Sequence, residues 1–127
     1  MLGDHDVGAT LPVRDLGAAR SFYEGTLGLK PSLDQSPEAV LYKAGSSMLL
    51  VYRSDYAGTN QATAATWAVG DELESVMDDL RSKGVSFEHY DLPETTREGD
   101  VHVMGDTRGA WFKDPDGNIL SLVNQPG

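Results

Sequence analysis

Residues 9–29, ATLPVRDLGAARSFYEGTLGL, decide the fold of this chain because they predict a strand followed at once by a helix. The apolar run 9–13 has the length of a short strand. Its proline indicates an edge position or a bulge, since proline cannot donate to a sheet. Asp15 is a good N-cap for the helix, and Gly28 stands where such a helix commonly ends. The stretch therefore predicts one strand–helix unit.

The same unit occurs a second time along the chain. Val69-Gly70-Asp71-Glu72 opens a second helix in the way that Val13-Arg14-Asp15-Leu16 opens the first, and Gly84 follows it as Gly28 follows the first. The offset between the copies is the same at these landmarks, which indicates a duplicated unit. Two units of this size are marginal alone, so we expect them to share one core in a single domain over residues 1–127.

Further strands are predicted after each helix. In the first unit they fall at residues 29–33, 39–43 and 48–53. In the second unit, one strand precedes the helix at 64–69 and three follow it at 85–90, 111–113 and 119–123. Each unit therefore reads as a strand, a helix and three strands (βαβββ), with modules at 7–53 and 62–125 and a polar connector at 54–61.

Three local signals complete the second module. Asp71 and Glu74 have the spacing of a capping box at the start of the helix. Residues 92–109 are polar, with one proline and three glycines, and are predicted to form a long loop of the kind that is often functional or mobile. Residues 114–118, DPDGN, are a strong turn signal.

Composition excludes several classes of function. The absence of cysteine removes disulfides, thiolate metal sites and cysteine nucleophiles. The net charge of −10 argues against nucleic acid or an anionic membrane as a partner, because both require a basic face. No apolar run approaches the roughly 20 residues that span a bilayer. The acidic N-terminus is unlike a signal peptide, so we expect a cytoplasmic protein.

The opening and closing motifs together resemble a known family. Thr10-Leu11-Pro12-Val13-Arg14-Asp15-Leu16, followed by Ser21-Phe22-Tyr23 and Leu27-Gly28-Leu29, resembles the opening of the vicinal oxygen chelate superfamily, which includes glyoxalase I, extradiol dioxygenases and bleomycin resistance proteins. Residues 112–118, FKDPDGN, resemble its closing hairpin. The resemblance implies an α+β fold of two βαβββ modules, with mixed, curled sheets around a cleft, and a homodimer.

In the enzymes of this superfamily, the resemblance implies a divalent metal in the cleft, held by His or Glu from the first and last strands of each module. The corresponding positions here are Gly8, Ala64 and Ser121, together with an apolar residue within Met48 to Tyr52. Glycine and alanine have no ligating side chain, and neutral serine is a poor ligand for a divalent ion beside imidazole or carboxylate. We therefore predict that this metal site is absent, and we expect no cofactor.

Strand parity predicts what lines the cleft instead, because residues two apart in a strand share a face. The predicted ligand-binding residues are Thr10, Tyr52, Thr66, Trp111, Ser121 and, if the 92–109 loop folds over the cleft as a lid, His102. Small, weakly polar and aromatic side chains of this kind suit an apolar or aromatic ligand. His5 is expected to be a mobile N-terminal residue and His89 a solvent-facing strand residue.

Two classes of function stay open. The first, which the sequence favours, is a metal-free protein that binds a small apolar or aromatic molecule, like the bleomycin resistance branch, which sequesters a drug without chemistry. The second is a metal-dependent lyase, isomerase or dioxygenase of the glyoxalase type, against which the missing ligands argue. A metal-free enzyme that uses Asp or His of the long loop as acid or base is a third option, for which the sequence names no catalytic residue.

Overall fold

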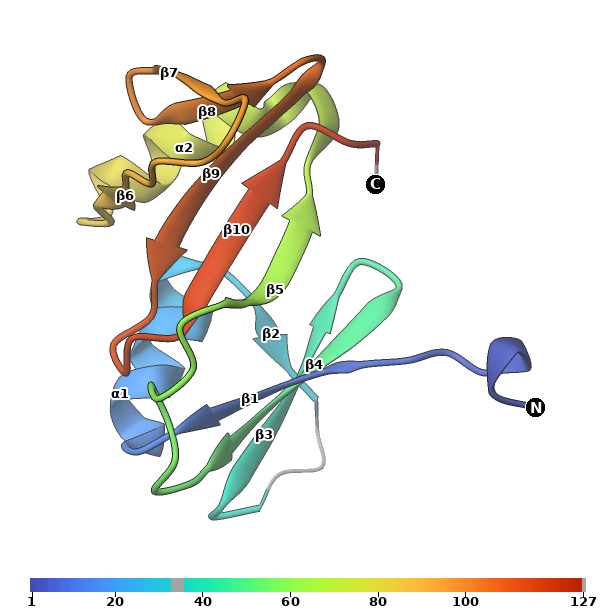
Figure 1. Ribbon diagram of the computed structural model, residues 1–127. Coiled ribbons are helices and arrows are strands. Elements are labelled where there is room, and N and C mark those ends of the chain that lie inside the picture. The colour runs from blue at the N-terminus through green and yellow to red at the C-terminus, as the bar shows by residue number, and fades with distance from the viewer. Residues whose placement is uncertain (33–35, 127) are drawn as a thin grey trace. The chain divides into compact units, whose positions relative to one another are not determined.

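The computed structural model describes residues 1–32 and 36–126 (Figure 1). These residues form two compact units. Unit 1 contains Met1–Gln61 and Pro115–Asn118, and unit 2 contains Ala62–Asp114 and Ile119–Gly127. Leu33, the predicted end of a strand in the first unit, lies outside the described residues. Within the described part of the chain, no helix has both the length and the apolar character needed to cross a membrane.

Unit 1 has a four-stranded sheet and one helical segment. Its elements are a helical turn η1 (Leu2–Asp4), β1 (Ala9–Val13), α1 (Leu16–Arg20), its π-helical continuation η2 (Ser21–Thr26), β2 (Lys30–Pro31), β3 (Ala39–Ala44) and β4 (Ser47–Arg53). The strand order is β1-β4-β3-β2, in which β1 and β4 run parallel and the other neighbours antiparallel. The predicted strand, helix and three strands are therefore present.

The helix of unit 1 begins where its sequence predicts. The Asp15 side chain accepts a hydrogen bond from the backbone N–H of Ala18 at 3.1 Å, and this bond caps the helix. After the helical segment, Gly28 has a φ of 75°, a left-handed conformation that glycine adopts at little cost. The chain can therefore turn from the helix into β2.

The core of unit 1 lies on one face of its sheet. Its buried aliphatic side chains come from β1, α1, β3 and β4: Leu11, Val13, Ala19, Val40, Leu49 and Val51. Buried Tyr42 stacks on Tyr23 and donates from its hydroxyl to Glu24 Oε2 at 2.8 Å. Tyr42 is thus a core residue, and the other face of the sheet carries Thr10 and its neighbours.

Unit 2 repeats this plan and adds a hairpin. Its elements are β5 (Thr63–Ala68), a helical turn η3 (Gly70–Glu72), α2 (Leu73–Ser82), β6 (Phe87–Glu88), β7 (Thr96–Glu98), β8 (Val101–Met104), β9 (Thr107–Lys113) and β10 (Ile119–Val123). The strand order is β5-β10-β9-β8-β7, with β6 also paired to β9. The β5–β10 pair is parallel, as β1–β4 is in unit 1.

The start of α2 corrects one local prediction. No side chain caps this helix, so the predicted capping box of Asp71 and Glu74 is wrong. The chain instead enters α2 through η3, in which the backbone N–H of Glu72 donates to the carbonyl of Val69 at 3.1 Å. This tight turn occupies the position at which the box was expected. The predicted apolar stripe is present, with Leu73, Met77 and Leu80 buried.

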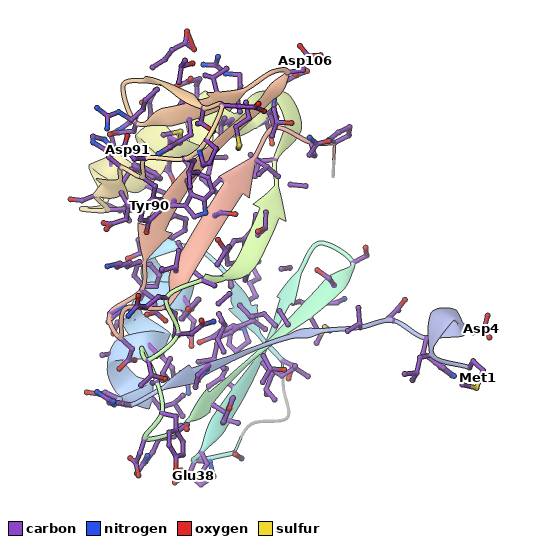
Figure 2. The ribbon with its side chains drawn as sticks, viewed as in Figure 1. Met1, Asp4, Glu38, Tyr90, Asp91 and Asp106 are labelled. Atoms are coloured by element: carbon purple, nitrogen blue, oxygen red, sulfur yellow. The ribbon has the colours of Figure 1, made fainter. Side chains whose placement is uncertain are left out.

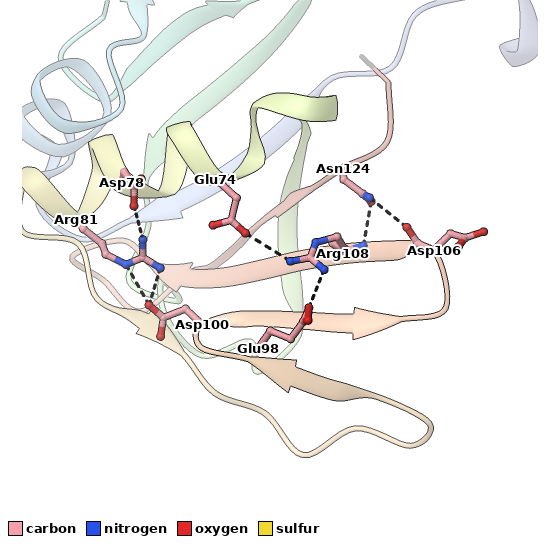
Figure 3. Close-up of polar contacts among 8 residues, drawn as sticks. All are labelled: Glu74, Asp78, Arg81, Glu98, Asp100, Asp106, Arg108 and Asn124. Atoms are coloured by element: carbon pink, nitrogen blue, oxygen red, sulfur yellow. Dashed lines mark hydrogen bonds and ion pairs between the residues drawn. The ribbon is translucent and has the colours of Figure 1, made fainter.

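The prediction that residues 92–109 form a long loop is also wrong. This segment contains β7, β8 and the first residues of β9. Its charged residues were interpreted as a sign of a loop, but they form ion pairs with α2 and with one another (Figure 3). Arg81 of α2 binds Asp100, and Arg108 of β9 binds Glu98 of β7 at 2.7 Å and Glu74 of α2 at 3.5 Å. The polar sequence therefore belongs to a paired surface hairpin.

Candidate functional site

Three of the predicted ligand-binding residues form one row across the sheet of unit 2. Ser121 of β10 pairs with Thr66 of β5 on one side and with Trp111 of β9 on the other. Residues paired across neighbouring strands share a face, and the hydroxyls of Thr66 and Ser121 lie 2.7 Å apart in a hydrogen bond. We call this the open face of unit 2, because Thr66 on it is exposed and Trp111 is half-buried, although Ser121 itself is buried. The opposite face carries the buried side chains of Leu120 and Leu122.

Thr63 joins this row, although strand parity alone would place it on the opposite face from Thr66. The indole Nε1–H of Trp111 donates to Thr63 Oγ1 at 3.0 Å. The register of β5 against β10 shifts beside Thr63, so that Ala64 is an extra residue in β5. Such a bulge redirects the side chains next to it. Sequence reasoning missed Thr63 because no residue type in this stretch signals a bulge.

His102 lies on β8, where it pairs with Gly109 of β9. It therefore faces the same way as Trp111, two residues further along β9. The two rings meet edge-on, with centroids 4.8 Å apart at 87°. His102 is wholly buried, and its Nε2 accepts the backbone N–H of Tyr90 at 3.0 Å. His102 is thus a strand residue, and it reaches this face without the 92–109 segment folding over the site as a lid.

Tyr90 completes an aromatic cluster with His102 and Trp111, and sequence reasoning missed it. Its ring centroid lies 5.6 Å from that of Trp111 and 6.2 Å from that of His102; Figure 2 labels its side chain. Burial raises the pKa of the Tyr90 hydroxyl, and the Glu88 carboxylate raises it further. The signal that could have identified Tyr90 was its position in the sequence. Tyr90 lies two residues after Glu88, and Glu88 pairs with Trp111 in the sheet. Tyr90, His102 and Trp111 are called the aromatic cluster below.

The other two predicted residues belong to unit 1. Pro12, two residues after Thr10, pairs with Tyr52 across β1 and β4, so Thr10 and Tyr52 share a face of that sheet. Thr10 is exposed and Tyr52 half-buried. The six predicted residues therefore divide into this pair and the four residues Thr66, His102, Trp111 and Ser121 in unit 2.

Unit 1 also has an open pocket of about 530 Å³ at the N-terminal end of β1. It is lined by residues 5–8 and by residues 46–48, which span the end of the β3–β4 turn and the start of β4. His5 and Asp6 are exposed, on an N-terminal segment whose first residues, Met1 and Asp4, extend away from the sheet of unit 1 (Figure 2). The pocket includes Gly8, one of the positions that correspond to a metal ligand, which contributes no side-chain donor.

The positions that correspond to the metal ligands do not fit a divalent cation. Gly8 and Ala64 carry no donor, and the neutral hydroxyl of Ser121 is hydrogen-bonded to Thr66. In the ranges 1–32 and 36–126, no three His, Cys, Asp or Glu side chains gather into a group that could hold a metal ion. These residues therefore support no reaction step through a metal, and metal-free function stays a prediction.

A second titratable group lies at the surface of unit 2. His89 Nε2 is 2.7 Å from Asp100 Oδ1, and Arg81 binds the other oxygen of the same carboxylate. The hydrogen bonds from His89 and Arg81 hold the pKa of Asp100 below its usual value, so this residue stays a carboxylate at neutral pH. These contacts join α2, the end of β6 and the β7–β8 turn, and they support the strands that carry the aromatic cluster.

Comparison with known proteins agrees with this geometry. The sequence matches the family profile described as the Glyoxalase/Bleomycin resistance protein/Dioxygenase superfamily over residues 7–122. No curated protein sequence matches the chain significantly.

Several solved structures share the fold. The bleomycin resistance determinant encoded on the transposon Tn5 has a TM-score of 0.72 and 20% identity, over 97% of this chain and 99% of that chain. Lactoylglutathione lyase from Agrobacterium tumefaciens has a TM-score of 0.69 and 20% identity, over 94% and 92%. The fosfomycin resistance protein FosX from Listeria monocytogenes has a TM-score of 0.66 and 16% identity, over 97% and 92%. At these identities the likeness shows the fold alone.

Proposed function

This chain belongs to the glyoxalase/bleomycin resistance/dioxygenase superfamily, and on that premise we propose that it is a metal-free binder of a small apolar or aromatic molecule. In this proposal the protein holds its ligand, as a drug-sequestering protein does, and does not convert it. The observation that carries the proposal is the aromatic cluster on the open face of unit 2, next to the hydroxyls of Thr63, Thr66 and Ser121.

The aromatic cluster supports an apolar or aromatic ligand. Trp111 is only half-buried, and its indole is held by Thr63 on one side and by the ring of His102 on the other. A fixed, partly exposed indole offers a large contact area with little further loss of side-chain freedom when a ligand binds. The neighbouring hydroxyls supply the few polar contacts that orient a ligand in a mainly apolar site.

The donor chemistry supports binding without a metal. Among the positions that correspond to the superfamily's ligands, Ser121 is the one in unit 2 that has an oxygen, and Thr66 already occupies it. The net charge of −10 favours a neutral or cationic ligand over an anionic one. We also propose that the protein is a cytoplasmic homodimer, which native mass spectrometry can test through the mass of the assembly.

The two tryptophans allow a direct test of the site. Trp111 lies on the open face, whereas Trp67 pairs with buried Leu122 and belongs to the opposite face. Trp67→Phe leaves Trp111 as the reporter, and Trp111→Phe leaves Trp67 as the matched control. Metal-free bleomycin, fosfomycin and S-lactoylglutathione are the probes, and each is titrated into both variants while tryptophan fluorescence and heat are recorded.

We expect the cationic, aromatic bleomycin to bind and to change Trp111 fluorescence, and the two anionic probes to bind at least about tenfold more weakly. Trp67 fluorescence should stay unchanged. Binding weaker than about millimolar for every aromatic probe, including a wider panel of aromatic and glycopeptide antibiotics, would count against the proposal. Elemental analysis of protein purified without chelators tests the metal separately, and a stoichiometric divalent ion would favour the alternative, a metal-dependent lyase, isomerase or dioxygenase.

A further inference from the structure

We infer that His102 supplies a single, fixed hydrogen-bond donor to the ligand site, so that the ligand carries a neutral hydrogen-bond acceptor, such as a ketone or amide carbonyl, beside its aromatic body. This inference rests on the proposed function and names the class of ligand more closely. It follows from the two ring nitrogens of His102, which have different surroundings.

The Nε2 atom of His102 has a defined role. It lies 3.0 Å from the backbone nitrogen of Tyr90, and a backbone N–H can only donate. Nε2 must therefore be an acceptor, which means that it carries no proton. In a neutral imidazole the proton is then on Nδ1, so the Tyr90 contact sets the tautomer of His102. An imidazolium at this position would lose the bond to Tyr90.

Among residues 1–32 and 36–126, the Nδ1–H donor that this tautomer creates has no hydrogen-bond partner. Nδ1 is buried and makes no hydrogen bond, and the same is true of the Tyr90 hydroxyl. A buried polar group without a partner lowers stability, and most such groups in folded proteins are satisfied. Two of them within one aromatic cluster indicate a place where a partner from outside the chain completes the hydrogen bonding.

The structural role of His102 does not account for Nδ1. The Tyr90 N–H needs only one acceptor atom. A side chain with an acceptor at the position of Nε2 and no polar atom at the position of Nδ1 would serve equally well. Tyr90 and Trp111, whose rings contact His102, are both only half-buried. A ligand can therefore approach His102 by a movement of the Tyr90 side chain, while the sheet and the Trp111 indole stay in place. The Nδ1–H donor then selects for an acceptor on the part of the ligand that reaches it.

The surroundings favour a neutral acceptor over an anionic one. Burial raises the pKa of the Tyr90 hydroxyl and the Glu88 carboxylate raises it further, and Glu88 pairs with Trp111 in the sheet. Lys113 lies 3.6 Å from Glu88, as an exposed ion pair that leaves no net positive charge there. A ligand carboxylate or phosphonate would find Lys113 already paired with Glu88. A carbonyl oxygen or ring nitrogen has the required lone pair without the charge.

The test uses two probes that differ by one acceptor, 1-indanone and indane, titrated into the full chain and followed by the NMR signal of the Trp111 indole N–H. We expect 1-indanone to bind about tenfold more tightly than indane, as one hydrogen bond to an otherwise unpaired donor predicts. Equal affinities would overturn the inference and leave the proposed function standing, and would mean that the Trp111 ring already serves as a weak acceptor for Nδ1–H. If neither probe shifts the Trp111 signal, the inference fails together with the proposed function.

Two variants separate the two nitrogens. The side-chain oxygen of Gln reaches the position of Nε2, whereas the side-chain nitrogen of Asn reaches that of Nδ1. His102→Gln should keep the Tyr90 contact and lose the preference for 1-indanone, and His102→Asn should retain a preference of more than about threefold. An unchanged preference in His102→Gln would overturn the inference.

A measurement on the unmodified protein tests the inference even if the variants fail to fold. Long-range ¹H–¹⁵N correlations of His102 at pH 7 report which nitrogen carries the proton. We expect a protonated Nδ1 and an unprotonated Nε2. A proton on Nε2, or on both nitrogens, would remove the premise.

Discussion

The guanidinium of Arg81 donates to one oxygen of Asp100 through both Nε and Nη2, at 3.1 and 2.8 Å (Figure 3). Arg81 lies in the last turn of α2, and Asp100 lies between β7 and β8. The contact therefore fixes the hairpin to the helix. Because His102 stands two residues after Asp100, the same contact supports the strand that carries the aromatic cluster.

Replacing Asp100 by Asn should lower the free energy of unfolding by about 1 kcal/mol near neutral pH, because the three hydrogen bonds that Arg81 and His89 make to this carboxylate are weakened. Urea denaturation followed by circular dichroism measures the change. Asp79→Asn is the matched control, since Asp79 forms an exposed ion pair at 3.2 Å with Lys83, which follows α2. The control should change stability by less than about 0.5 kcal/mol. Equal losses in both variants would contradict the role given to Asp100.

The contribution of Asp100 should depend on pH in a predictable direction. The hydrogen bonds from His89 and Arg81 hold the pKa of Asp100 in the folded chain below its ordinary value of 3.8. Stability from this group is therefore complete above that ordinary value and is lost as the pH falls through the lower folded pKa. The difference in unfolding free energy between the unmodified chain and Asp100→Asn should be largest at pH 5–6 and shrink towards pH 3. A difference that stays constant over this range would show that the carboxylate charge is not its source.

Removing the Tyr90 hydroxyl should stabilise the free protein, whereas removing the Tyr42 hydroxyl should destabilise it. The Tyr90 hydroxyl is buried without a partner in the described part of the chain, so Tyr90→Phe removes a desolvation cost and should raise the unfolding free energy by about 1 kcal/mol. Tyr42 donates to Glu24 at 2.8 Å, so Tyr42→Phe should lower it by about 1–2 kcal/mol. Thermal and urea unfolding of both variants provide the comparison. A loss of stability in Tyr90→Phe would indicate that a water molecule satisfies its hydroxyl in the free protein.

Two glycines of unit 1 should respond differently to alanine. Gly28 and Gly58 both have positive φ, at 75° and 73°. A Cβ on Gly28 would meet open space, whereas a Cβ on Gly58 would collide with the backbone carbonyl of Asp116. Gly28→Ala should cost about 1 kcal/mol from backbone strain alone, and Gly58→Ala should cost at least about 2 kcal/mol more. Similar costs in the two variants would mean that the 115–118 turn moves aside easily.

The elements with strong local patterns were predictable from the chain. The bounds predicted for the first and last strands are those of β1 and β10, and the cap at Asp15 is the hydrogen bond expected there. The alternation along β10 also predicted that Ser121 and the buried leucines beside it face opposite ways. These features depend on residues one to four apart, so a linear sequence contains them in full.

The 92–109 segment shows where local reasoning ends. Its charges and glycines favour a loop, and no apolar alternation announces β7, whose residues are all exposed. Arg81 of α2 supplies an opposite charge to Asp100 from outside the segment, and Arg108 within it pairs with Glu98 and with Glu74 of α2. Strand pairing and ion pairs with residues distant in the sequence support this hairpin, so its strands were not visible in its local pattern.

The residues around the candidate site divide in the same way. Repetition, periodicity and the types of residue at four positions were enough to establish a duplicated βαβββ chain and to predict a metal-free site, because each is a property of the linear order. The meeting of Tyr90, His102 and Trp111, and the contact from Trp111 to Thr63, arise from strand register and from one bulge in β5. Register and bulges are set by the packing of whole strands against each other, and a one-residue shift turns every side chain to the other face. Folding in three dimensions therefore decided which side chains this site presents to a ligand.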